Sequence, residues 1–312
     1  MREKIIVVGA RGLVGKSLTK KLESLGLNYV GISRSDVDLL DFKSTLKLID
    51  SLKPTCIIDA AAVVGGIKYN SDYPVKFLQE NLEIQNNLMR ASHEANVEKF
   101  VFLGSSCVYP RDCPQPIKEE YLLSGKLEPT NSAYAVAKIA GIELVRSYRK
   151  QFGRTWTSLM PTNTYGPNDN FDLNHSHVIP ALIRKFLIAK SKNLSSVEIW
   201  GTGQVRREFL YVEDLARAIL FCMDNFSSSE HINIGFGTDI TILDLAKLVS
   251  EIVDYQGEIV FNSDYPDGSP QKLLDSSKIF SMGWKPETSL QKGLELTVDW
   301  YLKNCLGDPN VV

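Results

Sequence analysis

Tyr134 and Lys138 are the two residues whose types and spacing most directly predict chemistry in this chain. They stand four positions apart in a run typical of a helix, so both side chains are expected on one face, one turn from each other. An ammonium beside a phenol favours the phenolate, so Lys138 is expected to lower the pKa of Tyr134. Such a pair can pass a proton to or from a substrate oxygen near neutral pH. The spacing alone more often belongs to a solvated helix face, so the assignment depends on other motifs.

A glycine-rich loop near the N-terminus predicts a dinucleotide-binding site. The loop has the spacing G-x-x-G-x-x-G, follows a β-branched run at 4–9 and opens a helical segment. Such glycines let the backbone turn tightly and approach a pyrophosphate at a helix N-terminus. The residues expected to hold the cofactor there are Gly9, Ala10, Arg11, Gly12, Leu13, Val14 and Gly15. The alternative is an ordinary glycine turn.

Two arginines favour NADP over NAD as that cofactor. An NAD-specific site usually ends its second strand with an acidic residue that binds the ribose hydroxyls. Here Arg34 closes the second strand, and Asp36 follows where the chain is expected to have left it. Arg11 and Arg34 can hold a 2′-phosphate between two guanidinium groups. We therefore expect NADP; the alternative is two solvated arginines.

Ser105 follows a fourth strand-like run and completes a set of three polar residues in chain order with Tyr134 and Lys138. Its hydroxyl is the better placed of two neighbouring serines to share a substrate carbonyl with the tyrosine. Ser106 is instead expected to satisfy backbone groups. Together with the glycine loop, this order predicts reduction or oxidation at a carbonyl carbon.

Strand-like and helical segments alternate through the first half of the chain, which predicts an α/β fold. The expected strands are 4–9, 28–33, 56–60, 99–104 and 155–161. This alternation predicts a Rossmann-type, doubly wound parallel sheet with helices on both faces. We assign residues 1–165 to an NADP-binding domain and 166–312 to a smaller C-terminal α/β substrate domain. A segment near 197–235 is expected to return to the first domain.

Composition excludes several classes of protein. The 312 residues include 35 basic and 37 acidic side chains with no basic stripe, so no nucleic-acid partner is expected. The apolar runs are too short to span a membrane. A strand begins almost at once, which leaves no room for a signal peptide. The five cysteines and four histidines show no metal-binding spacing, so we expect no metal and a reduced, cytoplasmic protein.

Longer stretches of sequence carry a resemblance to a known family. The stretches are 61–67, 105–110, 128–131, 161–171, 176–180, 200–203, 207–210 and 267–275. With the glycine loop and the Ser-Tyr-Lys order, the chain resembles the extended short-chain dehydrogenase/reductase superfamily. Within it, the chain is similar to the GDP-L-fucose synthase family. Val63 and Asn168 depart from the family pattern, but neither is a catalytic position there.

The resemblance implies an NADPH-dependent 3,5-epimerisation and 4-reduction of GDP-4-keto-6-deoxy-D-mannose to GDP-L-fucose. It assigns the two acid-base roles of epimerisation to Cys107 and His177, which otherwise read as a small buried residue and a loop-packing residue. A thiol and an imidazole both titrate near neutrality, which suits this work. Ser105, Tyr134 and Lys138 then serve the reduction.

The resemblance also implies a set of binding residues. Those expected to contact the GDP-sugar are Arg207, Trp200, Asp267, Lys272 and Lys185, and those expected near the cofactor are Arg34, Tyr134, Lys138, Asn163 and His177. For the lysines and acids the alternative is a solvated surface, and for Trp200 it is a core position. Asn163 and Asn170 are also expected near the sugar pocket. A homodimer built from the helices at 75–95 and 132–152 is implied as well.

Three rival functions remain at this stage. The nearest is the same chemistry, or 4-reduction only, on another GDP-4-keto sugar of a colitose or heptose pathway. A 4,6-dehydratase is disfavoured because Ser105-Ser106-Cys107 supplies no carboxylate pair. A redox sensor that binds NADP without turnover would not need Tyr134, Lys138 and Cys107 together.

Overall fold

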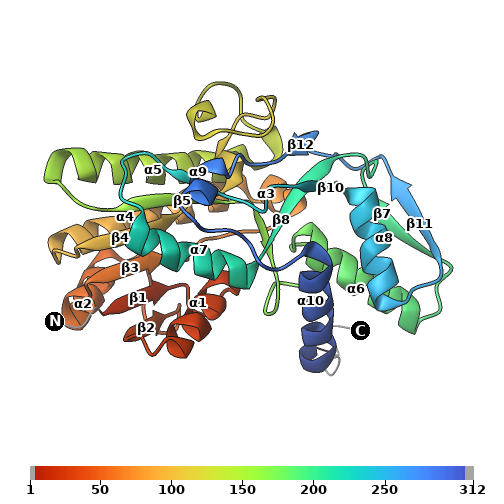
Figure 1. The fold of residues 1–312 in the computed structure, drawn as a ribbon, viewed down its shortest axis with the longest axis horizontal. Coiled ribbons are helices and arrows are strands. Elements are labelled where there is room, and N and C mark those ends of the chain that lie inside the picture. The colour runs from red at the N-terminus through yellow and green to blue at the C-terminus, as the bar shows by residue number, and fades with distance from the viewer. Residues whose placement is uncertain (1–3, 306–312) are drawn as a thin grey trace.

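A six-stranded parallel sheet is the main element of the computed structural model, which describes residues 4–305 (Figure 1). In spatial order its strands are β2 (Tyr29–Ile32), β1 (Ile5–Val8), β3 (Cys56–Asp59), β4 (Lys99–Leu103), β5 (Thr157–Pro161) and β9 (Ile232–Ile234). The strand order reverses direction between β1 and β3, and ligands of such sheets bind beyond the carboxyl ends of the strands at this point. The predicted fold class is confirmed.

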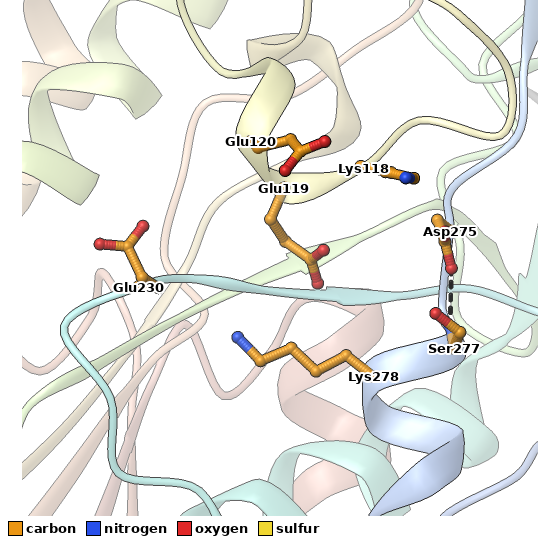
Figure 2. Close-up of a pocket in the computed structure, with 7 residues that line it drawn as sticks. All are labelled: Lys118, Glu119, Glu120, Glu230, Asp275, Ser277 and Lys278. Carbon is orange, nitrogen blue, oxygen red and sulfur yellow. Dashed lines mark hydrogen bonds between the residues drawn. The ribbon is translucent and has the colours of Figure 1, made fainter.

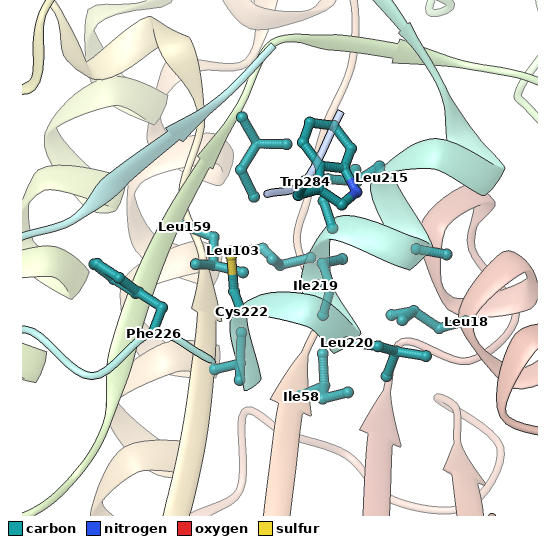
Figure 3. Packing of buried hydrophobic residues seen from close by; sticks show 14 of the residues in the cluster. Leu18, Ile58, Leu103, Leu159, Leu215, Ile219, Leu220, Cys222, Phe226 and Trp284 are labelled. Atoms are coloured by element: carbon teal, nitrogen blue, oxygen red, sulfur yellow. The ribbon is translucent and has the colours of Figure 1, made fainter. Parts of the chain in front are cut away.

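Alternation along the strands places apolar side chains on both faces of this sheet. Ile5 and Val7 face one core, and Ile6 and Val8 face the other. Helices α1 (Leu13–Ser24) and α7 (Val212–Asn225) cover the first face, and Figure 3 shows Leu18 and Ile219 packing there. Helices α2 (Phe42–Leu52), α4 (Pro74–Glu94) and α5 (Ser132–Phe152) cover the second. Burial on both faces explains why the strands read as continuous apolar runs.

A second group of elements lies at one end of the main sheet (Figure 1). Its strands are β6 (Asn163–Tyr165), β7 (Ser196–Trp200), β8 (Arg206–Tyr211), β10 (Asp239–Thr241), β11 (Glu258–Asn262) and β12 (Gln271–Lys272). Helices α6 (Val178–Ser191), α8 (Ile242–Val253) and α10 (Leu290–Cys305) enclose a separate apolar core. The chain returns to the main sheet through α7 and β9. We keep the boundary at residue 165 as a proposal.

Most long elements agree with the predicted ones to within two residues, but several short elements were missed. Strands β6, β8, β10 and β12, and helices α3 (Ile67–Asp72) and α9 (Ser277–Ser281), were not predicted. β12 has only two residues, and β8 begins with two arginines that conceal its apolar end. Such strands form through tertiary pairing, which local propensity does not encode. No helix between residues 4 and 305 is both long and apolar enough to cross a membrane.

His231 is completely buried just before β9, and its titration gives a testable pH effect. Burial, then the charges of Arg146 and Lys278, lower its pKa from 6.5 to about 4. The unfolded chain therefore takes up this proton at a higher pH than the folded protein. The histidine's contribution to stability is present above pH 6.5 and lost as the pH falls toward 4, by roughly 3 kcal/mol.

We expect His231→Gln to remove this part of the acid sensitivity. Urea unfolding at several pH values between 7 and 4 would give the free energy of unfolding of both proteins. The difference between wild type and variant should shrink as the pH falls. A difference that stays constant with pH would contradict the assignment.

Candidate active site

The glycine loop lies between the carboxyl end of β1 and the N-terminus of α1, where the fold places a ligand. Gly9 has φ +80°, and a Cβ there would lie 2.6 Å from the carbonyl oxygen of Ala60 at the end of β3. A Cβ on Gly15 would collide with the Gly9 carbonyl. Gly12 is the N-cap of α1 and has no side chain to cap it, so the helix N–H groups can receive a phosphate. The loop therefore fits a dinucleotide pyrophosphate.

The two arginines expected to hold a 2′-phosphate are both exposed near this loop. Arg34 follows the end of β2, as predicted. Asp36 accepts hydrogen bonds from the Ser33 N–H (2.8 Å) and hydroxyl (2.6 Å), which together with Arg11 lower its pKa. The carboxylate of Asp36 is thus bound to its own turn. Arg11 and Arg34 remain available for a phosphate.

Ser105, Tyr134 and Lys138 lie close together in the structure. Tyr134 and Lys138 lie on one face of α5, and both are buried. Ser105 comes two residues after the end of β4 and lies within hydrogen-bonding reach of the Tyr134 phenol. The Lys138 ammonium donates to the Leu103 carbonyl (2.9 Å) and lies over the Phe102 ring. A substrate carbonyl at this point would meet a hydroxyl and a phenol.

The prediction that Lys138 lowers the pKa of Tyr134 is wrong for the protein without cofactor or substrate. Burial is the largest influence and raises the pKa of Tyr134, and the nearby Cys107 and Asp59 raise it further, while the Ser105 hydrogen bond lowers it. The ammonium is 5.9 Å from the centre of the phenol ring and bonds to a backbone carbonyl instead. Burial also lowers the pKa of Lys138. A phenol that keeps its proton suits an acid that protonates the product oxygen.

Asp59 is a residue of this region that sequence reasoning missed. It ends β3, is 1% exposed and accepts a hydrogen bond from the Ala61 N–H (3.1 Å). Burial raises its pKa to about 6, against the opposing charge of Lys138. A single carboxylate at the end of an otherwise apolar strand is the feature of the sequence that could have identified Asp59. Asp59 therefore lies where it can influence the charge of Lys138.

Cys107 lies in a short 3-10 turn (Ser106–Val108) beside the same tyrosine. Its sulfur accepts a hydrogen bond from Asn131 Nδ2 (3.2 Å) and lies 3.9 Å from Lys272 Nζ. Asn131 belongs to the stretch 128–131 that resembles the family, and its sequence position alone predicts no role for its side chain. It occupies the N-cap of α5, yet its side chain makes no cap hydrogen bond there. The Asn131 side chain therefore bonds to the thiol instead of capping its own helix.

His177 is the N-cap residue of α6 and lies on a solvent-accessible wall. Desolvation by the surrounding protein nevertheless lowers its pKa. The preceding His175 accepts a hydrogen bond from Gly66 N (3.0 Å) and packs on Tyr69. Tyr69 in turn belongs to the cluster around Tyr134 and Cys107. These contacts place His175, two residues before His177, beside the cluster around Tyr134 and Cys107.

Residues predicted to contact the GDP-sugar continue the site away from Cys107. Arg207 is largely enclosed; burial lowers its pKa, and the nearby Cys107 opposes that shift. Its Nη2 donates to the Asp267 carbonyl (3.1 Å). The Asp267 carboxylate accepts hydrogen bonds from the N–H and hydroxyl of Thr202, both at 2.8 Å. Asp267 thus orders the loop beside Arg207, while Lys272 lies nearer the thiol than expected.

Trp200 and Lys185, two more residues predicted to contact the GDP-sugar, belong to an aromatic stack. The Trp200 ring stacks on Tyr265 with centroids 4.3 Å apart and an interplanar angle of 10°. Lys185 lies 5.1 Å from the centre of the Trp200 ring and donates to the Glu198 carbonyl (2.9 Å); burial lowers its pKa. Tyr265 was not predicted, because an isolated tyrosine in a polar loop gives no signal. Trp200 therefore does not lie in the core: it is partly buried and stacks on the exposed ring of Tyr265.

Asn163 lies at the junction between the two groups of elements. It begins β6, and its amide donates to the Glu208 carbonyl (2.9 Å) across to β8. This position is beyond the carboxyl end of β5, at the same edge as the other candidates. Among residues 4–305, no group of histidine, cysteine or acidic side chains is arranged to hold a metal ion.

The candidate residues form a continuous series with one order. Tyr134 packs beside Cys107, whose sulfur lies 3.9 Å from Lys272 Nζ, and Lys272 pairs with Arg207 on the adjacent strand. Arg207 contacts Asp267, the Asp267 carboxylate bonds to Thr202, and Thr202 follows the strand that ends at Trp200. Proton-transfer groups, then cations, then aromatic rings match a sugar, a diphosphate and a nucleobase in that order.

Comparison with known proteins agrees with this geometry. Residues 5–235 match the NAD dependent epimerase/dehydratase family. The chain is 50% identical to the probable GDP-L-fucose synthase 1 of Oryza sativa subsp. japonica, over 97% of this chain and 93% of that protein. It is 39% identical to the GDP-L-colitose synthase of Yersinia pseudotuberculosis, over 96% and 98% of the two chains.

A solved structure has the same fold. MlghC, the GDP-mannoheptose C4 reductase of Campylobacter jejuni with NADP bound, superposes with a TM-score of 0.87 at 37% identity, over 96% of this chain and 98% of that one. This similarity extends over nearly the whole chain, and so includes both the glycine loop and the residues around Cys107. The chain therefore belongs to the NAD dependent epimerase/dehydratase family, and within it to the GDP-L-fucose synthase group.

Proposed function

We propose that this protein is an NADPH-dependent enzyme that inverts C3 and C5 of GDP-4-keto-6-deoxy-D-mannose and reduces C4, giving GDP-L-fucose. The observation that carries the proposal is the continuous series from Tyr134 and Cys107 to Lys272, Arg207 and Trp200. Its order matches the three parts of a nucleoside diphosphate sugar. The family relationship supports the same reaction and cofactor.

Epimerisation requires a base and an acid on opposite faces of the sugar ring. The C4 ketone acidifies the protons on C3 and C5, and an enolate forms when one of them is removed. Cys107 serves as one proton-transfer group, and the Lys272 ammonium lies 3.9 Å from its sulfur. His177, whose lowered pKa keeps the imidazole neutral at pH 7, serves as the other.

Reduction uses the Ser-Tyr-Lys set. Bound NADPH would supply the hydride for C4 of the keto sugar. Ser105 orients the ketone oxygen by a hydrogen bond. Tyr134 donates the proton that this oxygen requires, and its buried phenol carries that proton at neutral pH. Lys138 holds the end of β4 through its bond to Leu103 and can restore the proton to the phenol.

The cofactor preference gives a test of Arg34. Arg11 belongs to the glycine loop, Arg34 follows the end of β2, and both guanidinium groups are exposed. Losing one charge-assisted contact costs roughly 1.5–3 kcal/mol. Arg34→Ala should therefore weaken NADPH binding by about tenfold or more and leave NADH binding nearly unchanged. Titration of both cofactors by fluorescence would show this, and an equal loss for both would refute it.

The identity of the product decides between this reaction and its nearest alternative. The relationship to a GDP-colitose synthase and a GDP-mannoheptose reductase favours, as second candidate, related chemistry on another GDP-4-keto sugar. We expect NMR of the product formed from GDP-4-keto-6-deoxy-D-mannose and NADPH to show the L-galacto configuration. A product reduced at C4 without inversion at C3 and C5 would indicate a simple 4-ketoreductase.

We further infer a cytoplasmic homodimer. Helices α4 and α5 pack against each other and leave Val75 and Val136 exposed, 71% and 47% respectively. These apolar side chains on two adjacent helices favour a second copy of the chain as partner. The acid-base role of Cys107 requires a reduced thiol, the state that the cytosol maintains. Light scattering of the purified protein would test the dimer.

A further inference from the structure

Tyr109, two residues after Cys107, begins a buried polar network that the reaction above does not use. Tyr109 is 2% exposed, and its hydroxyl lies 2.5 Å from Asn233 Oδ1 and 2.9 Å from His231 Nε2. His231 and Asn233 are both completely buried and belong to the β9 region at the edge of the main sheet. Three polar side chains this deeply buried must satisfy one another.

The hydrogen bonds fix the proton positions in this network. Asn233 Oδ1 accepts only, so Tyr109 donates to it. Arg146 Nη2 lies 3.5 Å from His231 Nδ1, which must accept from a guanidinium, so the histidine carries its proton on Nε2 and donates it to Tyr109. Burial and two cations lower the pKa of His231 to about 4, which keeps this neutral form at physiological pH. The network is therefore fully paired in one arrangement.

Asn233 extends the network to a second segment. Its amide donates to the carbonyls of Ile117 (2.9 Å) and Asp275 (3.3 Å), and its backbone N–H donates to Glu119 Oε1 (3.0 Å). Ile117 also exchanges backbone hydrogen bonds with residues 273 and 275. Figure 2 shows the solvent side of this junction, where Glu119 and Asp275 line a charged hollow. The segment held in this way continues directly from β12, which ends at Lys272.

The segments that carry Cys107 and Lys272 are therefore both attached to one buried junction. Cys107 is linked to it through Tyr109 at the end of the 3-10 turn. Lys272 is linked to it through residues 273–275. Its ammonium is 3.9 Å from the sulfur, a separation that depends on where these two segments are held.

We propose that Tyr109, His231 and Asn233 are positioning residues for epimerisation: their hydrogen bonds hold the Cys107 thiol and the Lys272 ammonium side by side. Loss of the Tyr109 hydroxyl leaves His231 and Asn233 each short of a buried partner and releases the turn that carries Cys107. The proposal rests on the proposed function, since it assumes that Cys107 transfers a proton in epimerisation.

The test measures two rates: alkylation of the Cys107 thiol, and exchange of the C3 and C5 protons of the keto sugar with solvent. Tyr109→Phe should lower the rate at which iodoacetamide alkylates Cys107 by about fivefold. Mass spectrometry of the peptide that contains Cys107 would measure this rate. Tyr109→Phe should also slow deuterium incorporation at C3 and C5 of the GDP-4-keto sugar in D₂O by about tenfold, because small displacements of a catalytic group cost this much or more. NADPH affinity should not change.

A double-mutant cycle separates positioning from general loss of stability. Lys272→Met should lower alkylation of Cys107 to a similar extent, and Tyr109→Phe added to it should cause little further loss. Fully multiplicative losses would overturn the proposal. Tyr255→Phe is the matched control, because it removes another buried tyrosine hydroxyl, bonded to the Leu194 carbonyl (3.0 Å) in the C-terminal core. It should leave both rates at wild-type values.

Three further outcomes are decisive. If Tyr109→Phe fails to fold, His231→Gln provides the second test, with both rates expected to fall by two- to threefold; unchanged rates would refute the proposal. Normal exchange in Cys107→Ser would mean that the acid-base assignment of the proposed function fails. Lost exchange in Cys107→Ser together with normal exchange in Tyr109→Phe would refute only the positioning role.

Discussion

Tyr134→Phe should abolish reduction of the keto sugar while the protein still binds NADPH. The substitution keeps the buried ring and removes only the proton donor, and a positioned acid typically contributes 10²–10⁴-fold to the rate. Because burial raises the pKa of this phenol, a neutral donor is lost rather than a phenolate. Stopped-flow measurement of NADPH oxidation with the GDP-4-keto sugar should therefore show a loss of about 10²-fold or more.

The control for this substitution lies on the same helix. Tyr148 packs against His93 and Trp156 at the far end of α5, so Tyr148→Phe removes an equivalent hydroxyl outside the site. It should leave the rate of NADPH oxidation nearly unchanged. If Tyr134→Phe kept most of the wild-type rate, the product oxygen would receive its proton from another group. The assignment of Ser105 and Tyr134 would then be wrong.

Local sequence predicted the parts of the fold that local interactions determine. The strands of the main sheet are buried on both faces and thus appear as short apolar runs, such as Cys56–Asp59. The helix Ser132–Phe152 was predicted with its observed bounds. The short strands β10 and β12 were missed because they exist only through pairing with β8. Their partner lies more than 25 positions away, so local sequence carries no signal for them.

The site shows the same division between local and tertiary information. The spacing of Tyr134 and Lys138 indicated one helix face, and the structure confirms that placement. The spacing could not show that the ammonium of Lys138 bonds to Leu103 instead of supporting the phenolate. It also could not show that Lys272, far along the chain, approaches Cys107. Electrostatic effects depend on burial and on distant partners, so a motif gives the residue types without their pKa values.

Cys107→Ser and His177→Gln should each abolish solvent exchange at C3 and C5 of the keto sugar. Serine keeps the approximate size of the cysteine but holds its proton near neutrality, and glutamine does not titrate. In D₂O with the GDP-4-keto sugar, deuterium incorporation followed by NMR should fall by about 10²-fold or more in both variants. Tyr134→Phe should still incorporate deuterium, because its defect lies in the later reduction.

A second cysteine and a second histidine provide the controls for this experiment. Cys113→Ser changes a cysteine of the same loop whose pKa is raised by burial, and His93→Gln changes a histidine of α4 that packs on Tyr148 and Phe152. Both should exchange at rates close to wild type. If Cys107→Ser and His177→Gln also exchanged normally, neither residue would be the acid or the base. The cation-lined thiol would then have a binding role, and 4-reduction without epimerisation would become the better account of this site.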